Sequence, residues 1–321
     1  MPVSVNKKAM KLVQEAMSRP EDFGLSIFRD SSGATIIDAG IKASGGYSAG
    51  RLVTEICMGD LGKASITYMD YEGLRLPSIF VDTDYPAIST LGAQFAGWRI
   101  KTEKYFAMGS GPARALSLKP KELYQKIAYE DESDEAVLVL ETDSYPPLEA
   151  LEYIAKECEV QLQNLYILVA STSSLAGSVQ ISGRIVEAGI HKLTEIGFDP
   201  KRILYGCGCA PIAPIHPKSA RAMGRTNDAL YYGGFTYYTV DFEDDLKLKE
   251  IVAKAPSSTA KDYGKPFYEI FKAANFDFYQ IDPGLFAPAV FAVNNIKTGA
   301  TYTAGKMNLT ILKQSIGLIE S

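Results

Sequence analysis

The segment ASITYMDYEGLRLPSIFVDTD, residues 64–84, alternates apolar and polar side chains on both sides of the Glu72-Gly73 pair. Alternation with a period of two is typical of strands with one buried face, and a short turn containing glycine between two such runs predicts a β-hairpin. A hairpin joins antiparallel strands directly, whereas parallel strands need a crossover of about a dozen residues or more. The segment therefore argues against a wholly parallel, doubly wound sheet.

The rest of the chain alternates predicted strands and helices. Short apolar runs rich in β-branched residues predict buried strands at residues 34–41, 136–142 and 165–170. Helical spacing predicts one helix at residues 147–158 and another at 178–196, which Gly197 and Pro200 would end. Several strand pairs lie too close in the sequence for a helical crossover. This mixture favours the α+β class.

Charge and composition are those of an ordinary globular protein. Among 321 residues, 33 are basic and 38 acidic, which gives a net charge of −5, and no long basic stripe suggests nucleic acid as a partner. No apolar run approaches the ~20 residues that a membrane span needs, and the first residues lack the apolar core of a signal peptide. Four cysteines in a chain of this length do not predict a disulfide framework. We therefore expect a cytoplasmic protein with no membrane partner.

The segment VQISGRIVEAGIHKL, residues 179–193, puts Arg184 and Glu187 three positions apart, on one face of the predicted helix. Apolar side chains fill most other positions, which indicates a largely buried helix, and a buried carboxylate has to be paired or functional. A structural ion pair and an active site both fit this spacing. Small residues on neighbouring turns favour the active site, because they let a ligand or another backbone come close. These residues are Ser178, Ser182, Gly183 and Gly189.

The segment GSGPARAL, residues 109–116, offers backbone N–H groups and the cation Arg114, as a phosphate-binding turn would. It matches neither the P-loop nor the dinucleotide fingerprint, and a tight turn without any ligand also explains its glycines. Lys101 and Lys104 lie shortly before it and favour an anion-binding role.

The cysteines and histidines do not predict a metal site. Cys207 and Cys209 are closer in sequence than paired zinc ligands usually are, and the other cysteines stand isolated. His191 and His216 are the two histidines of the chain, and no Ser-His-Asp spacing suggests covalent catalysis. We therefore expect no metal ion.

Five stretches are jointly distinctive: AMGSGPARAL, GSVQISGRIVE, PAISTLGAQFAGW, TNDALYYGG and DYGKPFYEIFKAANFDFYQIDPGLFAPA. Together they resemble the methenyltetrahydromethanopterin cyclohydrolase family, over nearly the whole chain. The resemblance implies a hydrolase of archaeal one-carbon metabolism and methanogenesis, which needs no cofactor and assembles as a homotrimer. It also implies two α+β domains with a substrate cleft between them. We expect these domains at residues 1–150 and 151–321, with a chain that can cross between the two lobes more than once.

Within ISGRIVE, the resemblance puts the family's catalytic glutamate on Glu187 and its partner arginine on Arg184. One position departs from the family pattern, because Phe95 stands where relatives carry a lysine after the glutamine of LGAQFAGW. Any role of that lysine is therefore not carried over. The candidates for binding the pterin substrate and its anionic tail are Gln94, Lys101, Lys104, Ser110, Arg114, Gln180 and Ser182.

The reaction that the resemblance implies adds water to the methenyl carbon of the pterin cation and gives formyl-tetrahydromethanopterin, reversibly. One carboxylate can take a proton from the water and later give it to the leaving arylamine nitrogen. We expect Glu187 to act in this way, first as a general base and then as a general acid, with Arg184 orienting it.

Two other functions fit the residues. One is a small-molecule phosphotransferase that uses GSGPARAL as its nucleotide loop, although carboxylate ligands for the divalent ion of phosphoryl transfer are hard to place. The other is a non-catalytic ligand-binding or assembly protein, in which Arg184 and Glu187 bridge a subunit interface. The tyrosine-rich stretch LYYGGFTYYTV, residues 230–240, fits either an interface or the core of a sheet.

Overall fold

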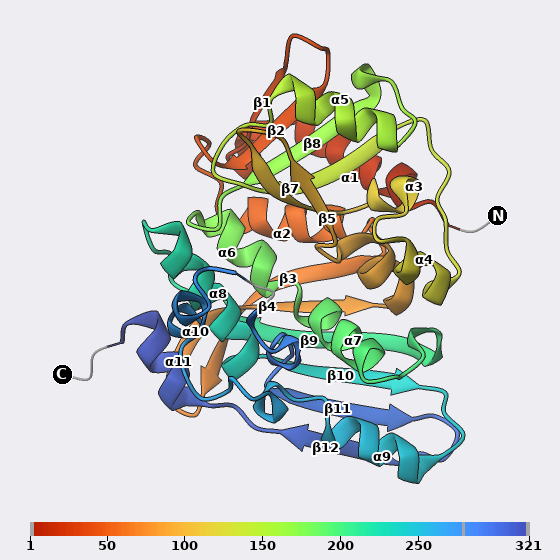
Figure 1. Ribbon diagram of the computed structural model, residues 1–321, viewed down its shortest axis with the longest axis vertical. Helices are drawn as coiled ribbons and strands as arrows, with labels where there is room; N and C mark the ends of the chain where they lie inside the picture. The colour runs from red at the N-terminus through yellow and green to blue at the C-terminus, as the bar shows by residue number, and fades with distance from the viewer. Residues whose placement is uncertain (1–2, 278–279, 319–321) are drawn as a thin grey trace. The chain divides into compact units, whose positions relative to one another are not determined.

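The computed structural model describes residues 3–277 and 280–318. The chain divides into two compact units: unit 1 is Met1–Lys63 with Ala87–Gln180, and unit 2 is Ala64–Pro86 with Ile181–Ser321. Within the described residues, each unit contains one six-stranded mixed sheet with helices packed on it, which confirms the α+β class (Figure 1). The division differs from the expected boundary after residue 150. The hairpin segment belongs to unit 2, and residues 151–180 belong to unit 1.

The sheet of unit 1 has a parallel centre. Its strand order is β1-β2-β8-β7-β6-β5. Strands β2, β8 and β7 run parallel, and the outer strands pair antiparallel. The parallel strands are the three apolar runs predicted from the sequence, and nearly all of their residues are buried, as is typical of parallel strands covered on both faces. The strands are β1 (Ser26–Arg29), β2 (Thr35–Gly40), β5 (Trp98–Lys101), β6 (Phe106–Ser110), β7 (Ala136–Glu141) and β8 (Leu165–Ala170).

Two buried clusters show how the helices cover this sheet. Ile37 and Val139 pack with residues of α1 and α2, whereas Ile36 and Leu138 pack with residues of α5. Successive residues of a strand point to opposite faces, so α1 and α2 lie on one face and α5 on the other. The predicted helix at 147–158 is α5. The helices of unit 1 are α1 (Val5–Ser18), η1 (Pro20–Phe23), α2 (Tyr47–Cys57), η2 (Ala87–Gln94), α3 (Arg114–Ser117), α4 (Lys121–Ile127), α5 (Leu148–Glu157), η3 (Leu162–Asn164) and most of α6 (Leu175–Ser182).

The sheet of unit 2 is mainly antiparallel, with the strand order β12-β11-β10-β9-β4-β3. Strands β10 and β11 run parallel, and β9 pairs antiparallel with both β4 and β10. The predicted hairpin is present as β3 and β4. Glu72 and Gly73 both have positive φ angles, of 50° and 91°, as the favoured two-residue hairpin turn requires. The strands are β3 (Gly62–Tyr71), β4 (Leu74–Thr83), β9 (Ile203–Pro211), β10 (Phe235–Val240), β11 (Val290–Asn295) and β12 (Thr301–Gly305).

The single helix predicted at residues 178–196 is wrong, because the structure has two helices there, α6 and α7. The break lies at Gly183 and Arg184, where the Arg184 N–H bonds the carbonyl of Ile181 at 3.0 Å in a tighter turn. Figure 1 shows α7 lying along β9 and β10 of unit 2. The helices of unit 2 are α7 (Ile185–Glu195), η4 (Pro200–Arg202), α8 (Ser219–Gly233), α9 (Asp245–Ala253), η5 (Ser257–Thr259), α10 (Phe267–Ala273), η7 (Pro283–Leu285) and α11 (Leu309–Ile316).

The tyrosine-rich stretch mostly serves the core. Tyr231, Tyr232 and Tyr238 are buried, whereas Tyr237 points to the opposite side of its strand and is 42% exposed. In the described part of the chain, no helix has the length and apolar composition of a membrane span.

Candidate active site

Glu187 and Arg184 lie together at the start of α7. Arg184 is the residue before the first turn and Glu187 is the third residue of the helix. The Arg184 Nη1 and Glu187 Oε2 atoms are 4.0 Å apart, and the two side chains are 10% and 8% exposed. Helix N-termini carry partial positive charge, so the helix and the guanidinium both stabilise a carboxylate at this position. The pair is therefore largely buried.

The loop between α6 and α7 is fixed by its neighbours in unit 2. The Ser182 hydroxyl is buried and donates to the carbonyl of Pro211, at the end of β9, at 2.8 Å. One turn further on, the Tyr238 hydroxyl donates to the Val186 carbonyl at 2.8 Å. Ser182 thus has an anchoring contact in the structure, while its predicted role in substrate binding stays a prediction.

Two of the other predicted site residues come together in unit 1. Gln94 is the last residue of η2, a π-helix, and Ser110 is the last residue of β6. The Cys57 thiol lies 3.2 Å from the Ser110 hydroxyl and 3.9 Å from the Gln94 carbonyl oxygen. Gln180, on α6, is 2% exposed. Cys57 was not singled out from the sequence, because a single buried cysteine looks like any other small apolar residue.

Arg114 has the contacts of a structural residue. Its side chain is fully buried, and the guanidinium donates to the carbonyls of Leu91, Ala93 and Lys119 at 3.2, 3.0 and 2.8 Å. The guanidinium carbon also lies 5.3 Å from the ring centroid of Phe95 and 5.5 Å from that of Tyr124. These contacts favour a role in holding η2 rather than the predicted role in holding a phosphate.

The backbone of the GSGPARAL segment is also engaged within unit 1. The Gly111 N–H donates to the carbonyl of Ala93, and the Ala113 N–H donates to the carbonyl of Val137, both at 2.8 Å. A nucleotide cradle needs several such N–H groups pointing at the ligand. The contacts therefore favour the tight-turn interpretation of these glycines over the nucleotide loop.

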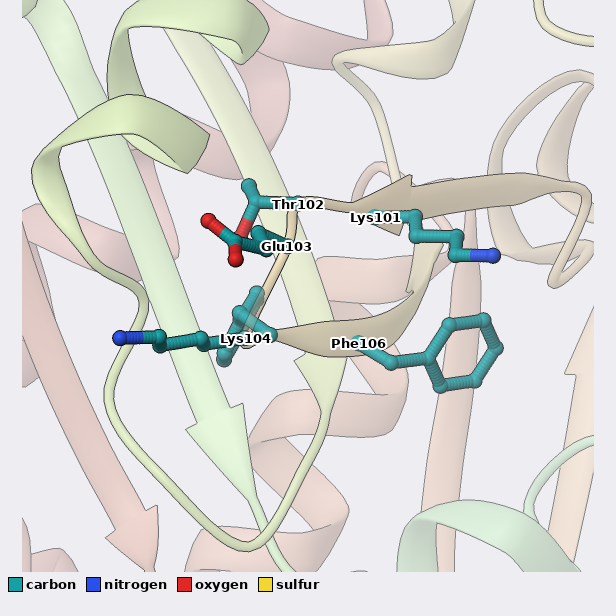
Figure 2. Close-up of a pocket in the computed structure, with 6 residues that line it drawn as sticks. Lys101, Thr102, Glu103, Lys104 and Phe106 are labelled. Carbon is teal, nitrogen blue, oxygen red and sulfur yellow. The ribbon is translucent and has the colours of Figure 1, made fainter.

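Lys101 and Lys104 flank the turn between β5 and β6. Residues 101–106 line an open hollow of about 300 Å³. Figure 2 shows the two lysine side chains extending in opposite directions, with the Glu103 carboxylate near the turn. Because the two side chains extend in opposite directions, each lysine is a separate candidate for the anionic tail.

The surroundings of the two cysteines of β9 favour the protonated thiol. Burial raises the pKa of Cys207, and it raises the pKa of Cys209 to about 11. Zinc binds the thiolate form, so both shifts oppose metal binding. Across residues 3–277 and 280–318, no three His, Cys, Asp or Glu side chains are grouped as a metal site.

Two buried carboxyl groups were not singled out from the sequence. Asp38, at the end of β2, accepts backbone N–H groups of residues 40–43 and the Tyr145 hydroxyl; burial opposes its ionisation, but these hydrogen bonds lower its pKa. Asp228, on α8, accepts from the Phe267 N–H and lies 2.5 Å from the Ser315 hydroxyl. Burial raises the pKa of Asp228 to about 7. What distinguishes these two aspartates from the others is their burial, and burial is seen in the structure rather than in the sequence.

The structure is thus an α+β protein in which a largely buried carboxylate and guanidinium lie together at the start of α7. A sequence model of the family described as "Cyclohydrolase (MCH)" matches residues 4–316. The chain therefore belongs to this cyclohydrolase family, and it is an enzyme.

Relatives with the name methenyltetrahydromethanopterin cyclohydrolase match along their full length. The protein from Methanococcoides burtonii is 50% identical, over 98% of this chain and 99% of its own. The protein from Methanocaldococcus jannaschii is 48% identical over 99% of both chains. The protein from Methanosarcina mazei is 50% identical, over 98% of this chain and 99% of its own. The family resemblance seen in the sequence is confirmed.

Proposed function

We propose that this enzyme hydrolyses the methenyl-tetrahydromethanopterin cation to formyl-tetrahydromethanopterin, reversibly, in the one-carbon metabolism of an archaeal cytoplasm. The names of the full-length relatives support the substrate class. The observation that carries the chemistry is the largely buried Glu187, held at the first turn of α7 with Arg184 at 4.0 Å.

In the proposed mechanism, Glu187 acts twice. The substrate carbon lies between two nitrogens that share a positive charge, so it is already electrophilic. Glu187 takes a proton from water as the water oxygen bonds this carbon, which gives a neutral tetrahedral adduct. The same carboxyl group then protonates the arylamine nitrogen. The bond between that nitrogen and the carbon breaks as the formyl C=O forms, and the hydroxyl proton leaves to solvent.

Arg184 has two functions in this proposal. It orients the Glu187 carboxylate, and it moderates the attraction of that carboxylate for the substrate cation. The substrate's charge disappears during the reaction, so an unmoderated carboxylate would stabilise the ground state more than the transition state. General acid–base catalysis by such a group contributes roughly 10²–10⁴-fold to the rate.

The remaining parts of the proposal concern binding and assembly. We propose that Gln94, Ser110, Gln180 and Ser182 contact the pterin, and that Lys101 or Lys104 contacts its anionic tail. We also propose that the enzyme works as a homotrimer and needs no cofactor, as the family resemblance implies. Neither the phosphotransferase nor the non-catalytic alternative gains support from the relatives.

The test compares wild-type enzyme with Glu187→Gln by following the decay of methenyl-tetrahydromethanopterin absorbance, with a chelator present and no nucleotide. We expect fast wild-type turnover and a loss of roughly 10²-fold or more in kcat for the variant, because the amide cannot accept the proton. Glu195→Gln is the matched control, since Glu195 lies on the same helix and its side chain is 56% exposed. A folded Glu187→Gln enzyme with most of its activity would disprove the assignment.

A further inference from the structure

Tyr238 connects the sheet of unit 2 to the helix that carries Glu187. It lies on β10, its side chain is fully buried, and its hydroxyl donates to the Val186 carbonyl at 2.8 Å. Val186 immediately precedes Glu187 in the first turn of α7. A shift of this carbonyl therefore moves the backbone from which the Glu187 side chain extends.

Gly189 provides the space that the Tyr238 hydroxyl needs. A Cβ atom at position 189 would lie 2.0 Å from the hydroxyl oxygen and 3.0 Å from Cζ of the Tyr238 ring. Glycine in the middle of a helix is less stable than alanine, so its presence inside α7 has a cost that this contact explains. Gly189 and Tyr238 thus form an interlocking pair beneath the first turns of α7.

Burial also keeps the Tyr238 hydroxyl in its protonated, donating form at neutral pH. Burial raises the pKa of Tyr238 well above its usual value, with a smaller contribution from the nearby Glu187 charge. The hydroxyl therefore keeps its proton and remains a donor. A buried donor with a fixed partner holds position more rigidly than one that exchanges with water.

We propose that Tyr238 is a positioning residue for Glu187, acting through the Val186 carbonyl and dependent on glycine at position 189. The inference rests on the proposed role of Glu187 as the acid–base group. Tyr238 does not touch the reacting atoms in this scheme. Its hydroxyl fixes the start of α7 relative to β10, so that the carboxylate meets the water and the arylamine nitrogen in turn.

The first test is Tyr238→Phe, which keeps the ring and removes a single oxygen atom. We expect kcat to fall on the order of 10-fold with KM changed less than about twofold, since small displacements of a catalytic group reduce the rate without weakening binding. Tyr237→Phe is the matched control, because Tyr237 is the neighbouring residue on the same strand and is 42% exposed. A purely structural Tyr238 would lower the unfolding temperature and leave kcat unchanged at 25 °C, and that result would overturn the proposal.

The second test uses rescue. Gly189→Ala places a methyl group against the Tyr238 hydroxyl, so we expect a larger loss of kcat than in Tyr238→Phe. The double variant Gly189→Ala/Tyr238→Phe lacks that oxygen and keeps only the close approach of the methyl group to the ring, at 3.0 Å from Cζ. We therefore expect it to recover most of the kcat lost in Gly189→Ala, up to the level of Tyr238→Phe. If the reductions in kcat of the two single variants add up in the double variant, Gly189 and Tyr238 act independently and the proposed interlocking is wrong. If Gly189→Ala does not fold, a folded and active double variant gives the same support.

Glu187→Gln, measured beside these variants, separates the two proposals. Retained activity in Glu187→Gln would mean that the proposed function of Glu187 is wrong, whatever the Tyr238 variants do. An inactive Glu187→Gln together with a fully active Tyr238→Phe would mean that only the positioning role is wrong.

Discussion

Among single residues, Asp228 links the stability of unit 2 to pH. Its carboxyl group joins α8 to the first residue of α10 and to Ser315 of α11, and burial raises its pKa to about 7 from the ordinary value of 3.8. The folded state therefore binds a proton between these pH values that the unfolded state has lost. The free energy of unfolding should then decrease as pH rises from about 4 to 7, by at most ~1.4 kcal/mol per pH unit from this group.

Asp228→Asn removes this ionisation while keeping an oxygen for the Phe267 N–H. We expect the variant to lose most of that pH dependence, and at pH 8 to be at least as stable as the wild type. Urea unfolding at pH 5 and pH 8 measures both effects, with the exposed Asp134→Asn as the control. If the stability difference between pH 5 and 8 is the same in Asp228→Asn and the wild type, the coupling is absent.

The sequence predicted that Arg184 and Glu187 lie close together, and their side chains are 4.0 Å apart, but it did not indicate the contacts of Arg114. Spacing alone placed Arg184 and Glu187 on one side of a helix, because local geometry relates residues three apart. For Arg114, the acceptors are backbone carbonyls of residues 91, 93 and 119. Any residue supplies a carbonyl, so such partners leave no trace in the pattern of side chains. An arginine after a glycine-rich turn then looks like a phosphate ligand.

At the level of elements, Arg114 supports the π-helix η2. It donates to two carbonyls near the end of that helix, and the Tyr124 hydroxyl donates to a third, that of Gly92, at 2.8 Å. Arg114→Met fills similar space but removes the donors. The Ala93 carbonyl keeps the Gly111 N–H as a partner, whereas the Leu91 and Lys119 carbonyls lose the Arg114 donor. Each buried carbonyl left without a partner costs roughly 1–3 kcal/mol, so we expect the free energy of unfolding to fall by about 2 kcal/mol or more.

Urea unfolding of Arg114→Met measures this loss, and Lys121→Met, at an exposed position of α4, is the control. The hypothesis that Arg114 binds the phosphate of the substrate predicts the opposite result. A tail-binding Arg114 would show a raised KM with unchanged stability. That outcome would contradict the structural role.

The break between α6 and α7 shows why one helix was expected and two are present. The apolar spacing continues through residues 178–196, and no proline interrupts it, so local signals predict continuity. The two halves, however, belong to different cores. Gly50 of α2 is in close contact with Val179 of α6 in unit 1, whereas α7 packs on β9 and β10 of unit 2. Tertiary packing decides this boundary, and it places Glu187 in a first turn rather than mid-helix.

For the whole molecule, the α+β fold class could be predicted from the sequence, whereas the division of the chain into two units could not. Alternating and continuous apolar runs separate half-buried strands from fully buried ones, which is sufficient for the α+β class. The assignment of each strand to a sheet depends on pairing over long sequence distances. In unit 1, β8 lies between β2 and β7, although it follows both in the chain. The hairpin β3–β4 joins the strand β9, more than a hundred residues later.

This interleaving predicts that the chain cannot be divided at residue 150. A fragment of residues 1–150 lacks β8, the strand between β2 and β7, and contains a hairpin whose neighbour β9 is absent. The loss of a central strand leaves the backbone groups of two buried strands without partners, so we expect this fragment to be unfolded when expressed alone. Far-UV circular dichroism and thermal unfolding against the full chain measure this. The matched control is the same fragment co-expressed with residues 151–321, which together contain all strands of both sheets. A cooperatively folded fragment 1–150 on its own would show that the two units do not share the chain in the way that the strand order requires.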